Sequence, residues 1–291
     1  MIWIIGNKGM LGQELSRTFQ EAGVLFIGTD REVSILEPDT LREFSLQHKL
    51  SWIINCSGYT AVDKAEEDEA AAYAINRQGT ANIANLAAEL NIPLIHISTD
   101  YVFDGTSADP LSENAVTNPV SVYGKSKLAG EEKIRKICPK YYIIRTAWLY
   151  GQFGSNFVYT MIKLMNKLDN LKVVNDQYGS PTWTKDISGF IKKIIKSDSS
   201  LYGTYHFSDE GECTWFDFAG EIYRLGKGNG IITNKCNLIP CASSEYPTAA
   251  KRPAYSLLSK GKVKKSFSCN VPKWQDSINL FIRGINNNDI I

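Results

Sequence analysis

The chain opens with Met1-Ile2-Trp3-Ile4-Ile5-Gly6-Asn7-Lys8-Gly9-Met10-Leu11-Gly12, and this stretch decides its fold. The apolar residues at the start predict a strand that is buried on both faces. Glycines follow at a Gly-x-x-Gly-x-x-Gly spacing, where the strand leads into a helix. Glycine permits a tight turn and a close backbone approach, and the N-terminus of a helix attracts an anion. We therefore expect Gly6, Gly9 and Gly12 to surround the diphosphate of a dinucleotide, with structural turn glycines as the alternative.

The first half of the chain alternates short apolar runs with segments of helical periodicity. The candidate strands are Ile2–Ile5, Val24–Gly28, Trp52–Asn55, Leu94–Ser98 and Tyr142–Arg145. The candidate helices between them are Leu11–Ala22, Asp39–His48, Glu66–Leu90 and Tyr123–Ile137. This alternation predicts an α/β fold with a Rossmann-type, doubly wound parallel sheet.

The second half is richer in glycine, proline, asparagine and aromatic residues, and its elements are shorter. We expect an NAD(P)-binding Rossmann domain over residues 1–150, with segments near residues 180–200 returning to it. A smaller C-terminal α/β substrate-binding domain is expected over residues 151–291. The polar tail Asn286–Asp289 is expected to fray.

The composition excludes several classes of function. With 32 Lys and Arg against 31 Asp and Glu, bulk charge does not favour nucleic-acid or membrane binding. No apolar run reaches the ~18 residues of a membrane span, and the N-terminus lacks a signal-peptide pattern. The six cysteines form no Cys-x-x-Cys pair, which favours reduced thiols in the cytoplasm. His48, His96 and His206 are far apart, so we expect neither a metal site nor a Ser-His-Asp triad.

Two adjacent charged residues follow the second candidate strand. Asp30 is placed to bind the ribose 2′-OH of NAD, whereas Arg31 suits the 2′-phosphate of NADP. The two residues favour different cofactors, so the choice between NADH and NADPH stays open. The alternative for both is an ordinary charged turn.

Tyr123 and Lys127 are four residues apart, a spacing that puts both side chains on one face of a helix. A free tyrosine titrates near pH ~10, and an adjacent ammonium, together with the positive nicotinamide of the oxidised cofactor, favours its phenolate. Tyr123 would then donate a proton to a carbonyl oxygen during hydride transfer. Thr99 ends the fourth candidate strand, at the edge where ligands bind, and is expected to polarise that carbonyl.

Other residues near the carboxyl edge of the predicted sheet allow more than one interpretation. The small residues of Asn55-Cys56-Ser57-Gly58-Tyr59 would let the nicotinamide ribose lie close to the third strand. Asn76 either supports a water relay or marks a structural kink in its helix. His96 has strand neighbours on both sides and is expected to be a core histidine rather than a catalyst.

Several longer motifs carry a family resemblance. They are Gly9-Met10-Leu11-Gly12, Asn55–Glu66, Ser98-Thr99-Asp100-Tyr101-Val102-Phe103-Asp104-Gly105, Val122–Glu131, Arg145–Tyr150, Asn175–Thr182 and Tyr246–Pro253. Together they cover nearly the whole chain. The sequence resembles the extended short-chain dehydrogenase/reductases, and within them the family of dTDP-4-dehydrorhamnose reductases.

The resemblance implies roles for individual residues. It makes Tyr123 the proton donor, Lys127 its pKa partner and Thr99 the residue that orients the carbonyl. It assigns to the cofactor Gly9, Met10, Leu11, Ser34, Ile35, Gly58, Tyr59 and Thr60, together with Tyr123 and Lys127, and Ser34 stands where many members carry an acidic residue. It assigns to the substrate Thr99, Asp100, Trp148, Asn156 and Arg252, the last as a clamp for the diphosphate. From the residues alone, Trp148 is equally a core residue and Arg252 a solvated one.

The implied activity is reduction of the C4 keto group of dTDP-4-dehydro-β-L-rhamnose by NADPH or NADH. The alternatives are another nucleotide-sugar 4-keto-reductase or an epimerase of the same fold, and a non-catalytic regulatory subunit. A dehydratase is disfavoured because Asp100-Tyr101 follows Thr99 instead of an Asp-Glu pair.

The resemblance also bears on metal binding and assembly. Some members dimerise through a magnesium ion held by glutamates, and Glu14 matches one of these. Lys185 stands where a second is expected, and an ammonium is no metal ligand. We therefore expect no metal, and a monomer or a homodimer without a metal bridge.

Overall fold

The computed structural model describes residues 1–285, so the tail Asn286–Asp289 lies outside the described residues. Its centre is a six-stranded parallel sheet in the order β10-β5-β4-β3-β1-β2. The strands are β1 Ile2–Ile5, β2 Phe26–Thr29, β3 Trp52–Asn55, β4 Leu94–Thr99, β5 Tyr141–Thr146 and β10 Gly203–His206. The predicted α/β fold with a doubly wound parallel sheet is confirmed.

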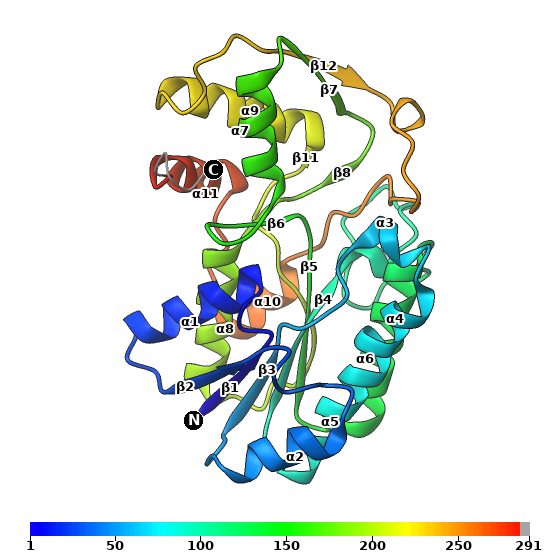
Figure 1. Cartoon of the computed structure of the whole chain (residues 1–291), viewed down its shortest axis with the longest axis vertical. Coiled ribbons are helices and arrows are strands. Elements are labelled where there is room, and N and C mark those ends of the chain that lie inside the picture. The colour runs from blue at the N-terminus through cyan, green and yellow to red at the C-terminus, as the bar shows by residue number, and fades with distance from the viewer. Residues whose placement is uncertain (286–291) are drawn as a thin grey trace.

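Helices cover both faces of this sheet (Figure 1). One face carries α1 Met10–Glu21, α8 Thr184–Ser197 and α10 Gly261–Phe267, and the other carries α2 Pro38–Leu46, α5 Thr80–Glu89 and α6 Val122–Ile137. The strand β1 shows why both faces are apolar. Ile2 and Ile4 pack into the core under α1 and α8, whereas Trp3 and Ile5 pack into the core on the α2 and α5 side.

One predicted helix is divided in the structure. The segment Glu66–Leu90 contains α4 Glu69–Tyr73, a π-helical turn at Ala74–Gly79 and then α5, and it is preceded by the short helix α3 Val62–Ala65. The later start has a local cause, because the Asp68 carboxylate accepts a hydrogen bond from the N–H of Ala71 and caps α4.

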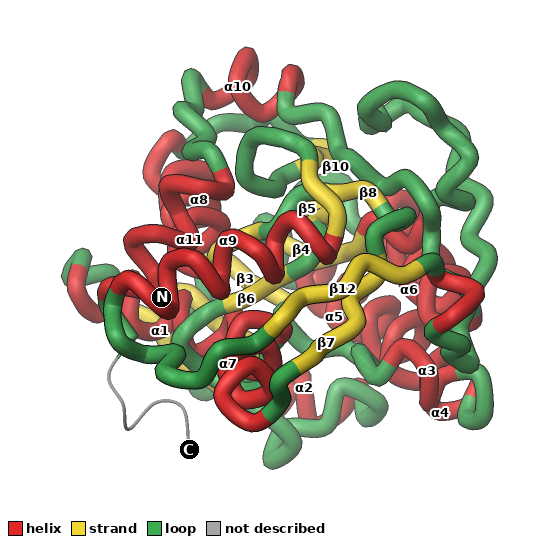
Figure 2. The backbone as a smooth tube through the Cα atoms, turned by 90° about the horizontal axis from the view of Figure 1, so that it is seen from above, coloured by secondary structure: helices red, strands yellow, loops and turns green. Residues whose placement is uncertain are grey.

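A second layer lies beyond the carboxyl edge of the sheet, where Figure 2 shows it from above. It contains α7 Phe157–Lys167, α9 Trp215–Gly228 and α11 Trp274–Arg283, with β7 Asn170–Val174 paired in parallel to β12 Asn237–Cys241. These helices and strands share a core rich in aromatic residues. Two short pairings join the layers: β6 Leu149–Tyr150 with β9 Thr182–Trp183, and β8 Tyr178–Gly179 with β11 Cys213–Thr214.

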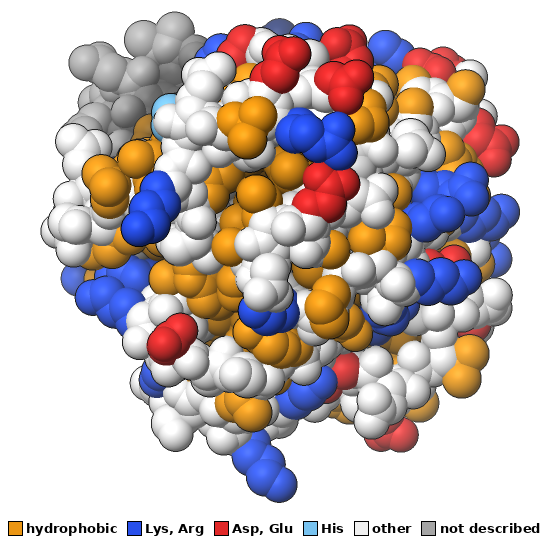
Figure 3. All heavy atoms as spheres, turned by 90° about the horizontal axis from the view of Figure 1, so that it is seen from below, with side chains coloured by type: hydrophobic (Ala, Val, Ile, Leu, Met, Phe, Trp, Pro, Cys, Tyr) orange, Lys and Arg blue, Asp and Glu red, His pale blue; other side chains and the backbone are white. Residues whose placement is uncertain are grey.

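Basic and acidic side chains are both spread over the face seen from below in Figure 3. All six cysteines have free thiols. Within residues 1–285, no helix combines the length and the apolar character required to cross a bilayer.

Candidate active site

A cleft of about 800 Å³ opens at the carboxyl edge of the sheet. Five strands send residues into it: β1 through the turn after Ile5, β2 through Asp30 and Arg31, β3 through Cys56–Thr60, β4 through Thr99, and β5 through Thr146–Leu149. Ligands of open α/β sheets bind at this edge. The cleft is therefore the candidate active site.

The turn between β1 and α1 depends on its glycines. Gly6 has φ +80°, and an added Cβ would lie 2.7 Å from the backbone nitrogen of Ser57. No side chain caps α1 and its first turn holds no acidic residue, so its N–H groups are available to an anion. Gly9, Met10 and Leu11 line the cleft, as does Gly6.

Gly12 has a different place from the other predicted cofactor residues. It does not line the cleft, and an added Cβ would lie 2.2 Å from the carbonyl oxygen of Gly6. Gly12 therefore lets α1 pack directly on the turn that forms the cradle.

The far end of the cleft combines charges of both signs. Asp30, Arg31, Ser34 and Ile35 line it as expected, and Lys8 joins them. Lys8 also lies 3.2 Å from the Glu32 carboxylate. Sequence reasoning did not select Lys8, although its place inside the glycine motif was a usable signal.

Thr99, Tyr123 and Lys127 come together in the cleft. Tyr123 and Lys127 lie on α6, next to the end of β4 that carries Thr99. The pKa of Tyr123 is raised to about 12 by its burial, and a hydrogen bond with the Thr99 hydroxyl offsets part of that rise. From the sequence we expected the Lys127 ammonium, together with the positive nicotinamide of the oxidised cofactor, to favour the phenolate. Among the protein's own groups, burial has the larger effect and keeps the phenol protonated at neutral pH.

Lys127 is held on the floor of the cleft. Its amine donates to the carbonyl oxygen of Ile97 at 2.6 Å and lies 3.3 Å from Nε2 of His96. Burial lowers the pKa of Lys127 to about 8, whereas the nearby Glu131 carboxylate raises it. His96 is fully buried, as expected of a core histidine, but it contacts this lysine directly.

Asn76 fixes the loop after β3. Its side chain accepts from the N–H of Tyr59 at 2.8 Å and donates to the carbonyl of Tyr59 at 3.1 Å. It also donates to the Ser126 hydroxyl on α6 at 2.9 Å. These contacts place Gly58, Tyr59 and Thr60 along the cleft wall.

Two of the proposed substrate residues, Asp100 and Trp148, line the cleft with Thr99. Burial raises the pKa of Asp100 to about 6. Trp148 adopts φ +48°, and its ring stacks on Trp215 with centroids 3.6 Å apart. This stack fixes the indole, and Gly179 leaves room for it because an added Cβ would lie 2.9 Å from the Trp148 ring.

The remaining two, Asn156 and Arg252, do not line the cleft. The Asn156 side chain caps α7: it accepts from the N–H of Tyr159 and donates to the carbonyl of Gly151. Arg252 forms a two-pronged ion pair with Asp63, at 3.0 and 3.2 Å. Local backbone and carboxylate partners therefore occupy both side chains.

Glu14 and Lys185, the two residues compared with the metal ligands of some family members, contact other side chains of the protein. Glu14 is buried and pairs with Arg17 at 2.7 Å, and the Lys185 ammonium lies over the Trp183 ring. Among residues 1–285, no three His, Cys, Asp or Glu side chains gather in a way that could hold a metal ion.

Known proteins share this architecture. A dTDP-4-dehydrorhamnose reductase from Aggregatibacter actinomycetemcomitans is 36% identical over 282 residues, covering 94% of this chain and 96% of that protein. The crystal structure of a dTDP-4-dehydrorhamnose reductase from Clostridium acetobutylicum has a TM-score of 0.91 and 41% identity, covering 97% and 98% of the two chains. That of the Bacillus anthracis enzyme in complex with NADP has a TM-score of 0.92 and 35% identity, covering 98% and 99%.

The Rossmann-type sheet, the glycine turn and the Tyr-x-x-x-Lys helix define an extended short-chain dehydrogenase/reductase. A family model described as the RmlD substrate binding domain matches residues 1–286. The chain belongs to the dTDP-4-dehydrorhamnose reductase family.

Proposed function

We propose that this chain reduces the C4 keto group of dTDP-4-dehydro-β-L-rhamnose with NADPH or NADH, giving dTDP-L-rhamnose. The observation that carries the proposal is the meeting of Thr99, Tyr123 and Lys127 beside the glycine turn in one cleft. Its membership of the reductase family supports the same reaction.

The residues of the cleft fit a nicotinamide dinucleotide. The turn at Gly6 has no room for a side chain, and the uncapped start of α1 offers N–H groups to a diphosphate. Asp30, Arg31 and Lys8 lie where they would meet the adenosine ribose. When bound, the cofactor supplies the hydride that reaches the substrate carbon.

Tyr123 is proposed as the proton donor. Burial keeps its phenol protonated at neutral pH, and a phenol that holds a proton suits the reductive direction. The Thr99 oxygen is held in place: its hydroxyl donates to Asp100 Oδ1 at 3.0 Å, and it accepts from the N–H of Tyr101. On substrate binding this one proton would turn from Asp100 to the carbonyl oxygen. We assign Thr99 to orienting the carbonyl oxygen and Lys127 to stabilising negative charge that develops on Tyr123.

Asp100 and Trp148 are proposed to contact the deoxysugar. The Asp100 carboxylate lines the cleft, with Ser256 as a neighbour inside the protein, and is placed to accept from a sugar hydroxyl. Trp148 presents a flat apolar surface that the Trp215 stack holds in place. Asn156 caps α7 and Arg252 pairs with Asp63, so contacts of these two side chains with the substrate stay predictions.

The setting of the reaction is also a proposal. We expect a monomer or a homodimer acting on a dTDP-linked 4-keto-6-deoxysugar in the cytoplasm. The free thiols of all six cysteines suit a reducing compartment.

A direct assay tests the proposal. Purified protein is mixed with NADPH or NADH and with a panel of 4-keto-6-deoxysugar nucleotides that differ in base and sugar, and consumption of reduced cofactor is followed by absorbance. We expect the highest kcat/KM with the dTDP-linked 4-dehydrorhamnose, and NMR of the product should show the L-rhamno configuration. A higher kcat/KM for another member of the panel would reassign the substrate, and no consumption with any member would reject the reductase function.

A further inference from the structure

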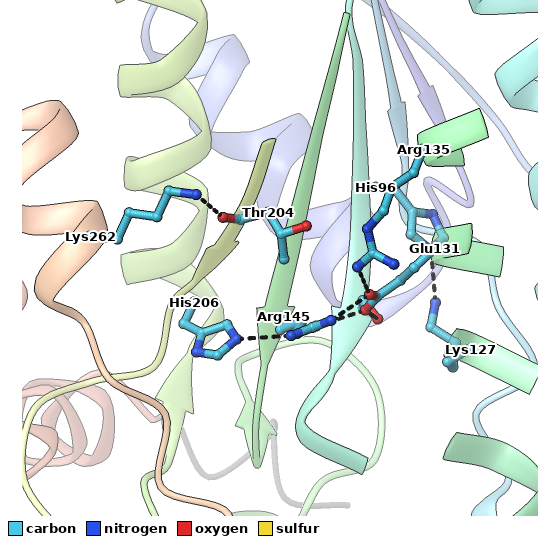
Figure 4. Close-up of polar contacts among 9 residues, drawn as sticks. His96, Lys127, Glu131, Arg135, Arg145, Thr204, His206 and Lys262 are labelled. Atoms are coloured by element: carbon cyan, nitrogen blue, oxygen red, sulfur yellow. Dashed lines mark hydrogen bonds and ion pairs between the residues drawn. The ribbon is translucent and has the colours of Figure 1, made fainter. Parts of the chain in front are cut away.

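His96, on the central strand β4, faces the lysine of the Tyr-x-x-x-Lys pair. It has no solvent-exposed surface, and its Nε2 lies 3.3 Å from the Lys127 amine. Figure 4 shows the His96 side chain directed toward Lys127 on the neighbouring helix α6. The contact brings a titratable ring against a group that is central to the proposed reaction.

The other ring nitrogen fixes where the imidazole carries its proton. Nδ1 of His96 lies 3.1 Å from the side-chain nitrogen of Asn55. The orientation of that amide is set by Ser57, whose N–H and hydroxyl both donate to Asn55 Oδ1, at 3.0 and 2.6 Å. The amide NH₂ group is a donor only, so Nδ1 must accept. Burial holds the pKa of His96 well below its usual value, so the ring is neutral and its single proton sits on Nε2.

This assignment has a consequence for Lys127. An ammonium has donors and no acceptor, whereas a neutral amine has a lone pair. The Nε2–H of His96 therefore makes a good hydrogen bond to the neutral amine and opposes the ammonium. The carbonyl of Ile97, at 2.6 Å, accepts from the amine in either state.

The other ionisable neighbours do not reverse this preference. Glu131 lies one turn further along α6 and favours the ammonium, but its carboxylate is shared by Arg145, at 2.8 and 3.0 Å, and Arg135, at 2.5 Å (Figure 4). Cys56 faces Lys127 from the loop after β3, and burial raises its pKa to about 12, so the thiol stays neutral. Burial of Lys127 itself also disfavours the charge.

We propose that His96 is a positioning residue of the reductase: its Nε2–H donates to the Lys127 amine, holds it against the Ile97 carbonyl and favours its neutral form. This inference rests on the proposed function, because it takes the charge of Lys127 to be needed for the reaction. The His96–Lys127 contact then sets the pH above which Lys127 loses that charge.

The pH profile of kcat/KM tests this role. His96→Leu removes the donor, and the limb that Lys127 contributes should move to higher pH by about one unit. His96→Gln offers an amide N–H in place of Nε2–H, and its limb should stay within about 0.3 unit of the unmodified enzyme. A purely structural histidine would lower the rate at every pH in the leucine variant and leave the limb in place, which overturns the proposal.

A second readout does not need turnover. Acetic anhydride labels neutral amines, so the labelling of Lys127 is measured against pH by peptide mass spectrometry, with the exposed Lys125 of the same helix as internal standard. The half-labelling pH of Lys127 should rise in His96→Leu and stay in His96→Gln, and equal values in all three proteins contradict the role. If circular dichroism shows that the leucine variant is misfolded, His96→Asn replaces it, because its shorter amide does not reach Nζ. Absence of keto-sugar reduction would reject the proposed function, while the labelling shift still decides the part that His96 plays.

Discussion

Tyr123 holds a proton in a partly buried position that faces the cleft. Tyr123→Phe removes this proton but keeps the ring, which meets Tyr101 edge-on at 5.5 Å. We predict that turnover falls by at least about 100-fold, the scale of general-acid catalysis, while binding of NADPH is retained. Steady-state kinetics and NADPH fluorescence titration measure the two effects.

The matched control is Tyr142→Phe, because Tyr142 is a buried tyrosine outside the cleft whose hydroxyl donates to the carbonyl of Ser199 at 2.6 Å. This variant should lose stability and keep its turnover. Normal turnover in Tyr123→Phe would remove Tyr123 from its proposed role.

Asp30 and Arg31 are predicted to divide the preference between the two cofactors. Both line the cleft, and a carboxylate suits a ribose 2′-OH whereas a guanidinium suits a 2′-phosphate. Arg31→Ala should lower kcat/KM for NADPH by about tenfold and leave that for NADH nearly unchanged, and Asp30→Ala should mainly affect NADH. Parallel kinetics with each cofactor test the pair, and an equal loss for both cofactors in either variant would contradict this division.

At the scale of helices and strands, the fit of α1 against the glycine turn is the most sensitive contact. A Cβ at Gly12 would lie 2.2 Å from the Gly6 carbonyl oxygen, so Gly12→Ala must push the helix away. We predict a loss of about 1–3 kcal/mol in the free energy of unfolding, together with weaker NADPH binding. Urea unfolding and cofactor titration measure both.

Gly189 provides the control within α8, the helix packed beside α1. An added Cβ there meets no atom within 4 Å. Gly189→Ala should leave cofactor binding unchanged and raise stability by up to about 1 kcal/mol, because alanine favours helix. Equal behaviour of the two variants would show that close packing at Gly12 is unimportant.

Most of the sheet could be predicted because its strands are short apolar runs between helical segments. The strand expected at Val24–Gly28 is found at Phe26–Thr29. Its ends differ by one or two residues because a sequence pattern does not define the exact boundary of an element. The π turn at Ala74–Gly79 could not be predicted, because its neighbours are ordinary helix formers and its cause is a tertiary one. Asn76 bonds there to Tyr59 and Ser126, which are distant in sequence.

The candidate site shows the same limit. Tyr123, Lys127 and Thr99 were selected because their spacing has a chemical reason that the sequence displays. The cap made by Asn156 and the Asp63–Arg252 ion pair depend on partners that only the folded chain brings together. The contact between His96 and Lys127 depends on the alignment of β4 with α6, which local periodicity does not contain.

At the scale of the whole molecule, a buried neutral histidine makes the fold sensitive to acid. Burial, with the Arg145 guanidinium acting in the same direction, lowers the pKa of His206 to about 3, whereas an unfolded histidine titrates near pH ~6.5. The contribution of neutral His206 to the free energy of unfolding is therefore complete above pH ~6.5. Below this pH the free energy of unfolding falls by about 1.4 kcal/mol per pH unit, because only the unfolded chain takes up the proton.

We predict that His206→Gln is less stable at pH 7.5 but loses less stability on acidification to pH 5.5. The comparison of the two proteins cancels the other titrating groups. Urea unfolding at both pH values measures it, and parallel losses would show that His206 titrates alike in the folded and unfolded chains.

The indole rings of Trp148 and Trp215 lie face to face, with 11° between their planes. Transition dipoles held this close exchange excitation, so the pair should give a split circular dichroism band that isolated tryptophans lack. One member of the pair lines the cleft while the other packs beside it on α9. A ligand that tilts the Trp148 ring should therefore abolish the split band. Binding in the cleft can then be followed by circular dichroism, without a label or a chemical reaction.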